Sequence, residues 1–377
     1  MRDLRPPFVS STIATHLDGF GVEKVKSFRD IAGNPPLRLN GFEHLRTEIA
    51  RLSVANPNSI LFYRGQNKDY LRDRVSTIMP SIYRNGAELI DDRNLKLRWR
   101  DLKIKSRLLC EEVEKRKIEN YSIIKSRKLI QWSILQHYEA AMTPLTDVTQ
   151  SIRVAASFAT LNNDSDSAVI YVFALPYYHN RISRNSEEVL TNIRLLSLCP
   201  SEAKRPYYQE GFLIGEEDIE FGGKVLESYD LRRRMIAKFE IPNTPEMWGA
   251  DETPLTYERL YPEGDVFTDI CRTIKDQAAE ELRLSDVPYT EEEIFEAMIW
   301  WRKIENLLTE KVGHDGRTPL SEILKALDNP RLSRRIGLAH RSIMALMHPR
   351  LAAPAHSQAY LLDMRGTYQQ LKQNLNR

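Results

Sequence analysis

The chain of 377 residues has few cysteines, no long apolar run and no marked excess of charge. Its three cysteines, Cys110, Cys199 and Cys271, are far apart and form no Cys-x-x-Cys pair. This usage favours reduced thiols in a cytoplasmic protein, and we expect no metal site. No apolar run reaches the roughly 18 residues that a membrane-spanning helix requires, and the first residues lack the apolar core of a signal peptide. We therefore expect a cytoplasmic protein without a membrane segment.

Opposite charges are nearly balanced, with 54 lysines and arginines against 52 aspartates and glutamates. This balance argues against a protein that coats nucleic acid by bulk charge, but it allows a local basic groove. The candidate groove is the tract of residues 93–128, which carries Arg93, Lys96, Arg98, Arg100, Lys103, Lys105, Arg107, Lys115, Arg116, Lys117, Lys125, Arg127 and Lys128. Because four glutamates interleave with these cations, a solvated helical face is the alternative.

The length allows two domains, each with its own core. We expect an N-terminal extension over residues 1–40, a mixed domain over residues 41–286 and a small all-α domain over residues 287–377. In the last segment, Thr290 stands before three glutamates as a capping-box candidate, and apolar residues follow at helical spacing.

Hydrophobic periodicity predicts both helices and strands within residues 41–286. Helices are expected over residues 41–50, over much of 88–138, and from about 150 through Phe158. Strands are expected up to Tyr63, at 168–175, and near 211–214 and 234–241. This pattern indicates the α+β class, with a mixed α/β domain followed by the all-α domain.

One short motif, Leu61–Phe62–Tyr63–Arg64–Gly65–Gln66, carries most of the chemical information. A buried strand ending in Tyr63 delivers a guanidinium, which can bind phosphate with two parallel hydrogen bonds. The glycine that follows would let the backbone approach a ligand closely. The alternative is an arginine paired to a local carboxylate at the start of a turn.

Further motifs follow in an order that resembles the FRG-domain family, which is named for its aromatic-Arg-Gly signature. They are Met79–Pro80–Ser81–Ile82–Tyr83–Arg84, Gln136–His137–Tyr138, the Thr143–Thr149 segment with Leu145 and Asp147, Val154–Ala155–Ala156–Ser157–Phe158–Ala159, the Arg205–Phe212 segment, Lys238–Phe239–Glu240–Ile241–Pro242 and Leu260–Tyr261–Pro262–Glu263. The resemblance covers roughly residues 40–277. Glu139 stands where the family usually has glycine, and the span from His137 to Asp147 is one residue longer.

The same order is similar to the mono-ADP-ribosyltransferase plan, in which an aromatic-Arg-Gly strand precedes a Ser-Thr-Ser-type strand and a final glutamate. The resemblance implies that NAD is the substrate and that its nicotinamide bond breaks through a centre with oxocarbenium character. On this plan, Tyr63, Arg64 and Gly65 bind NAD together with His137, Tyr138 and Thr149. Arg64 holds phosphate, Thr149 positions the ribose, and Tyr138 or Tyr207 stacks on nicotinamide. The catalytic carboxylate is Asp147 or Glu210, and Gln209 is an orienting amide.

Each of these roles has a structural alternative. Asp147 and Thr149 also fit a capping arrangement at the start of the following helix. His137 could be a half-buried histidine bonded to backbone. Glu216 and Glu217 compete with Glu210 as the carboxylate.

The resemblance implies a bacterial toxin of a toxin-antitoxin or anti-phage system that transfers ADP-ribose to a macromolecule. The basic tract makes RNA the first candidate acceptor. Apolar helices around Trp300–Trp301 are a candidate face for an antitoxin, with core packing as the alternative.

Two other classes of function remain open. Arg335 to His340 and Arg341 to His348 fit the spacing of HEPN-type ribonucleases. The FRG region could also sense nucleotides or bind a partner without turnover.

Overall fold

The computed structural model describes residues 14–15, 23–24, 28–86, 88–185, 190–216 and 229–286. The chain divides into two compact units, Met1–Asp276 and Gln277–Arg377. The expected all-α domain, with Trp300–Trp301 and the two Arg-to-His pairs, lies outside the described residues, as does Glu217.

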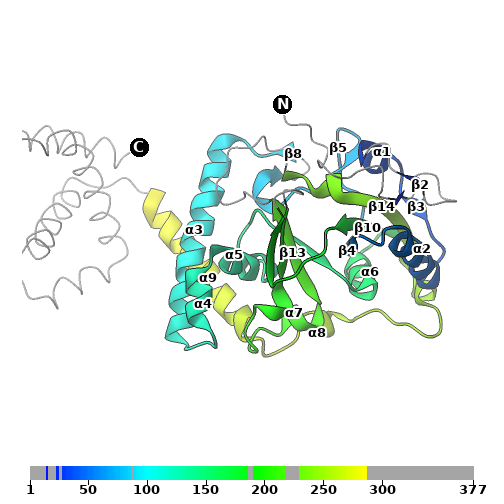
Figure 1. Ribbon diagram of the computed structural model, residues 1–377. Coiled ribbons are helices and arrows are strands. Elements are labelled where there is room, and N and C mark those ends of the chain that lie inside the picture. The colour runs from blue at the N-terminus through cyan, green and yellow to red at the C-terminus, as the bar shows by residue number, and fades with distance from the viewer. Residues whose placement is uncertain are drawn as a thin grey trace, which may run out of the picture. The chain divides into compact units, whose positions relative to one another are not determined.

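A mixed sheet of eight strands forms the centre of the first unit (Figure 1), in the order β11-β12-β13-β9-β4-β10-β14-β3. Its strands are β3 (Leu37–Arg38), β4 (Ile60–Gln66), β9 (Thr146–Thr149), β10 (Ser167–Leu175), β11 (Ile182–Asn185), β12 (Leu190–Arg194), β13 (Gly211–Glu216) and β14 (Met235–Pro242). Neighbouring strands are antiparallel except β14 and β3. Three small antiparallel pairs are β1 (Ala14–Thr15) with β2 (Glu23–Lys24), β5 (Leu71–Arg72) with β6 (Val75–Ser76), and β7 (Arg84–Asn85) with β8 (Glu88–Leu89).

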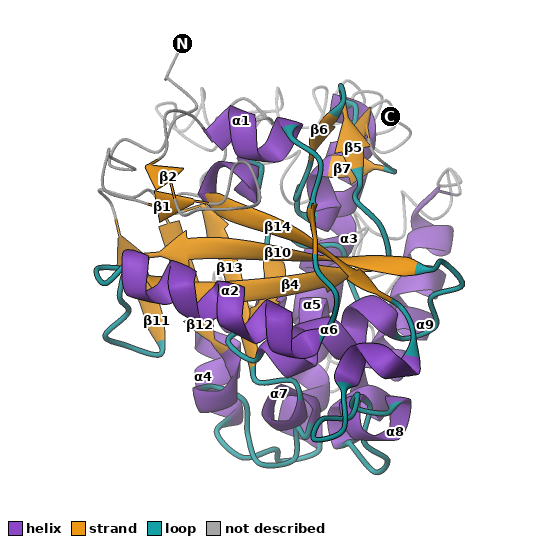
Figure 2. Cartoon of the chain, turned by 90° about the vertical axis from the view of Figure 1, so that its right-hand side faces the viewer, coloured by secondary structure: helices purple, strands orange, loops and turns teal. Residues whose placement is uncertain are grey.

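Helices cover both faces of this sheet, with α2 and α6 in front of the strands and α3 and α5 behind them in Figure 2. The α-helices are α1 (Phe28–Gly33), α2 (Phe42–Ala55), α3 (Asp92–Lys115), α4 (Tyr121–Ser126), α5 (Lys128–His137), α6 (Ile152–Thr160), α7 (Arg205–Tyr208), α8 (Tyr257–Leu260) and α9 (Val266–Asp286). Short 3-10 helices are η1 (Ser81–Tyr83), η2 (Leu195–Ser197), η4 (Leu231–Arg234) and η5 (Pro245–Trp248).

The core lies where β4, β10 and β14 meet the helices on either side. Phe62, Phe173 and Phe239, one from each strand, are fully buried. A strand covered on both faces reads as a continuous apolar run, and β10 has this pattern, with eight consecutive buried residues from Ala168. The strands predicted at 168–175, 211–214 and 234–241 are confirmed, as is the helix through Phe158.

Some elements were not predicted. The β11–β12 pair extends the sheet at one edge, and α9 follows the last closing motif. The segment expected as an N-terminal extension contributes β3, which pairs in parallel with β14 at Leu37 and Arg38.

Candidate functional site

A cavity of about 300 Å³ opens where β4 and β9 separate. Pairing between the two strands is limited to Tyr63 and Thr149. The cavity is lined by Tyr63, Arg64, Gly65, Gln136, His137, Glu139, Asp147, Val148, Thr149, Val154, Ala155, Phe158, Gln209, Gly211 and Tyr261. These residues come from three strands and two helices and from three loop positions, so the cavity forms only in the complete fold.

Arg64 spans the gap between the separated strands. Its Nη1 donates a hydrogen bond to the main-chain oxygen of Asp147, at 2.5 Å. Burial lowers the pKa of Arg64, the charge of Asp147 raises it, and the charge of Arg84 lowers it further. The bond is to a carbonyl, so it leaves the positive charge without a bidentate carboxylate partner and able to bind an anion.

Gly65 is required by packing between β4 and α6. A Cβ at this position would lie 1.9 Å from the oxygen of Ala155 and 2.9 Å from the Cβ of Ala159. The expectation that this glycine serves the approach of a ligand is therefore incomplete, because helix α6 already occupies one side of it. The small residues of the Val154–Ala159 motif are explained by the same close approach.

The Asp147 carboxylate is held by two neighbouring side chains of α5. Gln136 Nε2 donates to its Oδ2 at 2.8 Å, and His137 Nδ1 lies 3.1 Å from its Oδ1. Burial raises the pKa of Asp147, but the hydrogen bond and charge of His137 and the charge of Arg64 outweigh burial, so the pKa lies below its ordinary value. The carboxylate is therefore an anion at neutral pH, and a third of the side chain is exposed.

Helix α6 is capped by Ser151, not by Asp147. The Ser151 Oγ accepts a hydrogen bond from the N–H of Val154, and the Thr149 hydroxyl accepts from the N–H of Ser151. The capping interpretation of Asp147 is wrong, because Ser151 is the N-cap of α6 and the Asp147 carboxylate bonds to Gln136 and His137 instead. Thr149 is buried and its hydroxyl is engaged locally.

His137 is deeply buried, with 3% of its side chain exposed. Its Nδ1 lies within hydrogen-bond distance of Asp147 Oδ1, and its Nε2 is buried without a hydrogen-bond partner. The ring packs on Gly211, where a Cβ would lie 2.9 Å from His137 Cε1. The histidine is bonded to a carboxylate, so the expectation of a backbone partner is wrong.

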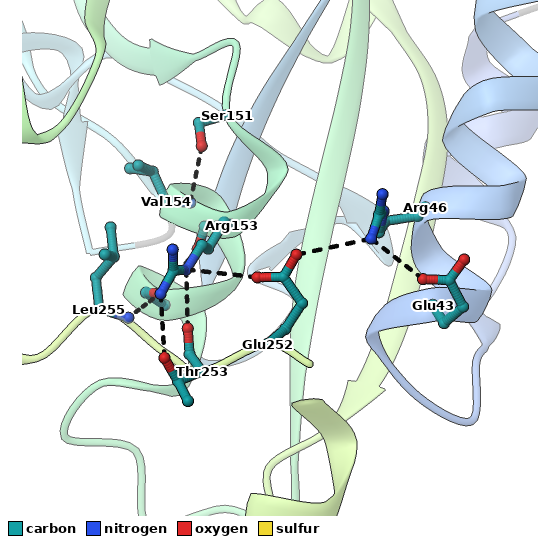
Figure 3. A network of polar contacts seen from close by, with 9 residues as sticks. Glu43, Arg46, Ser151, Arg153, Val154, Glu252, Thr253 and Leu255 are labelled. Atoms are coloured by element: carbon teal, nitrogen blue, oxygen red, sulfur yellow. Dashed lines mark hydrogen bonds and ion pairs between the residues drawn. The ribbon is translucent and has the colours of Figure 1, made fainter. Parts of the chain in front are cut away.

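A polar network anchors α6, which forms one wall of the cavity (Figure 3). Arg153 donates to the oxygen and the hydroxyl of Thr253, and the N–H of Leu255 donates to Ser157 Oγ at 2.8 Å. Glu252 joins Arg153 to Arg46 of α2 at 3.8 and 3.6 Å. The loop after η5 thus ties α6 to α2.

Phe158 and Tyr261 form an aromatic corner of the cavity, with ring centroids 6.2 Å apart in an edge-to-face arrangement. The Arg205 guanidinium lies 4.7 Å from the Tyr261 ring and 5.0 Å from the Tyr138 ring, so it holds the two tyrosines in place. The signal for this corner was present in the sequence, since both residues belong to the motifs of the family resemblance.

The two tyrosines expected to stack on nicotinamide do not line the cavity. Tyr138 is buried, and its hydroxyl donates to Asp265 at 2.8 Å. Tyr207 is 46% exposed. Hydrogen bonding of Tyr138 to Asp265 fixes the start of α9, since Asp265 also accepts from the N–H of Phe267.

Gln209 and Gly211 line the cavity, but Glu210 between them does not. Gln209 is buried and donates to the oxygen of Leu260 at 2.7 Å. Glu210 is exposed in a left-handed turn, with φ 45°. Its rival Glu216 is buried at the end of β13 and paired with Arg233. The structure thus separates Glu210 and Glu216 from the other candidate residues.

Glu139 is the carboxylate that sequence reasoning missed. Helix α5 ends in a Schellman motif, in which the N–H of Glu139 bonds to Gln136 O and the N–H of Ala140 to Leu135 O. This motif places Glu139 in the left-handed region, with φ 54°, which explains the usual glycine at this position. The exposed glutamate side chain lines the cavity instead.

Five of the thirteen cations of the basic tract form ion pairs with carboxylates of the same tract. Ion pairs join Lys105 to Asp101, Arg107 to Glu111, Lys115 and Arg116 to Glu112, and Lys125 to Glu114. These contacts favour the solvated helical face over a dedicated groove. Across the described part of the chain, no group of three or more His, Cys, Asp or Glu could hold a metal ion, and no helix could cross a membrane.

The site therefore belongs to a mixed α/β domain whose cavity is built from a Tyr-Arg-Gly strand, a Gln-His-Tyr helix end and a Thr-Asp-Val-Thr strand. The family model of the FRG domain matches residues 59–168, so this part of the chain is an FRG domain. No curated protein and no solved structure matches the chain. The cavity residues Gln209, Gly211 and Tyr261 lie beyond the matched segment.

Proposed function

We propose that this protein is an NAD-dependent ADP-ribosyltransferase that acts as a toxin in bacterial toxin-antitoxin or anti-phage defence. The observation that supports the proposal is the gathering of Arg64, His137, Asp147, Thr149 and Gln209 on one cavity. These residues were expected at an NAD site, and 145 positions separate the first from the last, since 209 − 64 = 145.

The size and polarity of the cavity suit the nicotinamide riboside end of NAD. A volume of about 300 Å³ is at the lower end of the range for small-molecule pockets. The Phe158–Tyr261 corner offers an apolar face for a flat ring. Arg64 offers a cation for the phosphates.

The charge of Asp147 gives it a role in the reaction. When the bond between C1′ and nicotinamide breaks, the electron pair goes to the ring nitrogen and positive charge develops on the ribose. A carboxylate that stays ionised stabilises this charge, and in many enzymes the stabilisation of developing charge provides most of the rate enhancement. Its low pKa makes Asp147 a weak base, so proton removal needs another group.

Glu139 is the second carboxylate on the cavity and takes the second role. As the acceptor nucleophile bonds to C1′, it loses a proton, which Glu139 removes. Gln136 and His137 hold the Asp147 carboxylate in place throughout. RNA is the proposed acceptor and an antitoxin the proposed partner.

The test uses two labels on NAD, one in nicotinamide and one in the adenylate phosphate, with separate pools of RNA, DNA and protein. We expect nicotinamide release to match transfer of the adenylate label into one pool. Arg64→Ala should abolish both while the protein stays folded, and the exposed Arg194→Ala on β12 is the matched control.

Two results would contradict the proposal. Saturable binding of NAD without release of nicotinamide would indicate a nucleotide-sensing module. RNA cleavage that needs no NAD and is lost in His340→Ala would indicate a nuclease.

A further inference from the structure

A second, smaller cavity of about 40 Å³ adjoins the first, and Arg64 and Gln136 line both. Its other walls are the end of β4, the segment before η1 and the start of β9. The lining residues are Arg64, Gln66, Tyr70, Thr77, Ile78, Met79, Pro80, Ser81, Arg84, Gly86, Gln136, Leu145 and Thr146.

The charges around this cavity are unbalanced. Arg64 and Arg84 line it, and no carboxylate does among the residues the structure describes. The charge of Arg84 lowers the pKa of Arg64 and also that of Arg98, so the Arg84 guanidinium lies close enough to repel each of the other two. Like charges at close range are destabilising unless an anion lies between them.

Hydrogen bonds to the main chain position Arg84 at the small cavity, so its side chain is available to bind a ligand. Arg98 Nη1 donates to the main-chain oxygens of Ser81, Ile82 and Arg84, at 2.9, 3.2 and 2.5 Å. Within the described ranges, the Arg84 guanidinium makes no hydrogen bond or ion pair. The Pro-Ser-x-x-Arg motif therefore fixes the backbone and presents a free cation.

Two buried polar atoms without hydrogen-bond partners also indicate that an anion binds in the small cavity. Thr146 Oγ1 and Gln66 Oε1 are both buried and have no hydrogen-bond partner. A hydroxyl can donate to an anion, and the Gln66 amide can do so with its nitrogen and oxygen exchanged. Unsatisfied buried groups of this kind are costly, so a bound group that satisfies them is expected.

The volume limits the ligand to a small one. A water molecule takes up about 10–15 Å³ of such a cavity volume. The cavity therefore holds about three waters or one tetrahedral anion of similar size. It cannot hold a nucleoside.

We propose that this small cavity binds a phosphoryl group, with Arg84 and the shared Arg64 as its two guanidinium ligands and Thr146 as a neutral donor. The rest of the ligand occupies the larger cavity, so the ligand class is a nucleotide diphosphate. Its assignment to the diphosphate of NAD rests on the proposed function.

Binding measurements on the full chain test this site with ADP, adenosine and inorganic pyrophosphate as probes. The wild type should bind ADP and pyrophosphate more tightly than adenosine. Arg84→Gln should weaken the binding of both anions by about tenfold or more, because it removes a charge-assisted hydrogen bond. Arg84→Lys should recover part of the affinity, since a point charge remains. Arg194→Gln, an exposed change on β12, should leave all three affinities unchanged.

Thermal unfolding with and without an anion distinguishes a ligand-binding role of Arg84 from a structural role. Without an anion, Arg84→Gln should melt no lower than the wild type, because it removes a repelling charge. With pyrophosphate, the wild type should gain melting temperature and the variant should gain less.

The inference is overturned if the wild type binds neither anion, or if Arg84→Gln binds ADP as tightly as the wild type. It also fails if NAD turnover in Arg84→Gln keeps the KM of the wild type. Loss of ADP binding in Arg84→Gln, in a protein that releases no nicotinamide from NAD, would refute the proposed function alone.

Discussion

Replacement of Gly65 by alanine tests the contact that aligns α6 with β4. The new Cβ would lie 1.9 Å from the oxygen of Ala155, and ordinary contact begins at 3.4 Å. Relief therefore needs a shift of about 1.5 Å, since 3.4 − 1.9 = 1.5. The obstacle is main chain, so no side-chain rotation can provide the shift.

The loss of stability depends on how tightly α6 is packed, because this helix must move to relieve the clash. Helix α6 is packed through Ala155, Ala156 and Ala159, each at most 1% exposed. Overpacking of a dense core costs about 1–3 kcal/mol and occasionally more, and a collision with main chain belongs at the upper end. We expect Gly65→Ala to lower the free energy of unfolding by about 3 kcal/mol or more.

Urea unfolding followed by circular dichroism measures this change. Gly33→Ala is the matched control, because nothing lies within 4 Å of a Cβ at Gly33. Adding Ala159→Gly to Gly65→Ala should not restore stability, since the Ala155 oxygen remains. A Gly65→Ala protein within about 0.5 kcal/mol of the wild type would refute the packing argument.

Three more predictions concern the cavity. Gly211→Ala should displace the His137 ring and slow NAD turnover more than it weakens NAD binding, which single-turnover kinetics can show; equal losses would contradict this. Folding lowers the pKa of Asp147. Its ionised form therefore stabilises the fold at any pH above the pKa of the unfolded chain, about 3.8, and this stabilisation is lost as the pH falls through the pKa of the folded protein. Urea unfolding should therefore show a stability difference between wild type and Asp147→Asn that is constant from pH 7 to about 4 and shrinks below pH 4. Glu139→Gln should reduce nicotinamide release by about 100-fold or more, whereas Glu210→Gln should retain it; the reverse result would return the carboxylate role to Glu210.

Local patterns predicted the elements that carry the site. The apolar run of β10 and the small-residue pattern of α6 are properties of neighbouring residues, so periodicity was enough to place them. Arg64 lies on β4, and Asp147 and Thr149 lie on β9. These strands are neighbours in the sheet, so the residues that the order of the motifs assigned to one site lie on adjacent strands.

Side-chain partners could not be predicted in the same way. The bond from Tyr138 to Asp265 joins residues 127 positions apart, and it removes Tyr138 from the cavity. Whether Glu139 or Glu210 faces the cavity depends on two left-handed turns, which depend in turn on how α5 and α7 end. These side-chain positions depend on distant partners and on helix-end turns that hydrophobic periodicity does not specify.

The order in which the cavity walls appear in the chain has a consequence during synthesis. Arg64 is made early, but the Tyr261 wall follows roughly 200 residues later. At ribosomal rates of about 5–20 residues per second, roughly 10–40 s pass between them. A nascent chain therefore carries its arginine without a cavity for that time, and a chain interrupted before residue 261 has no complete site. Catalysis, on the proposed function, begins only after most of the protein has left the ribosome.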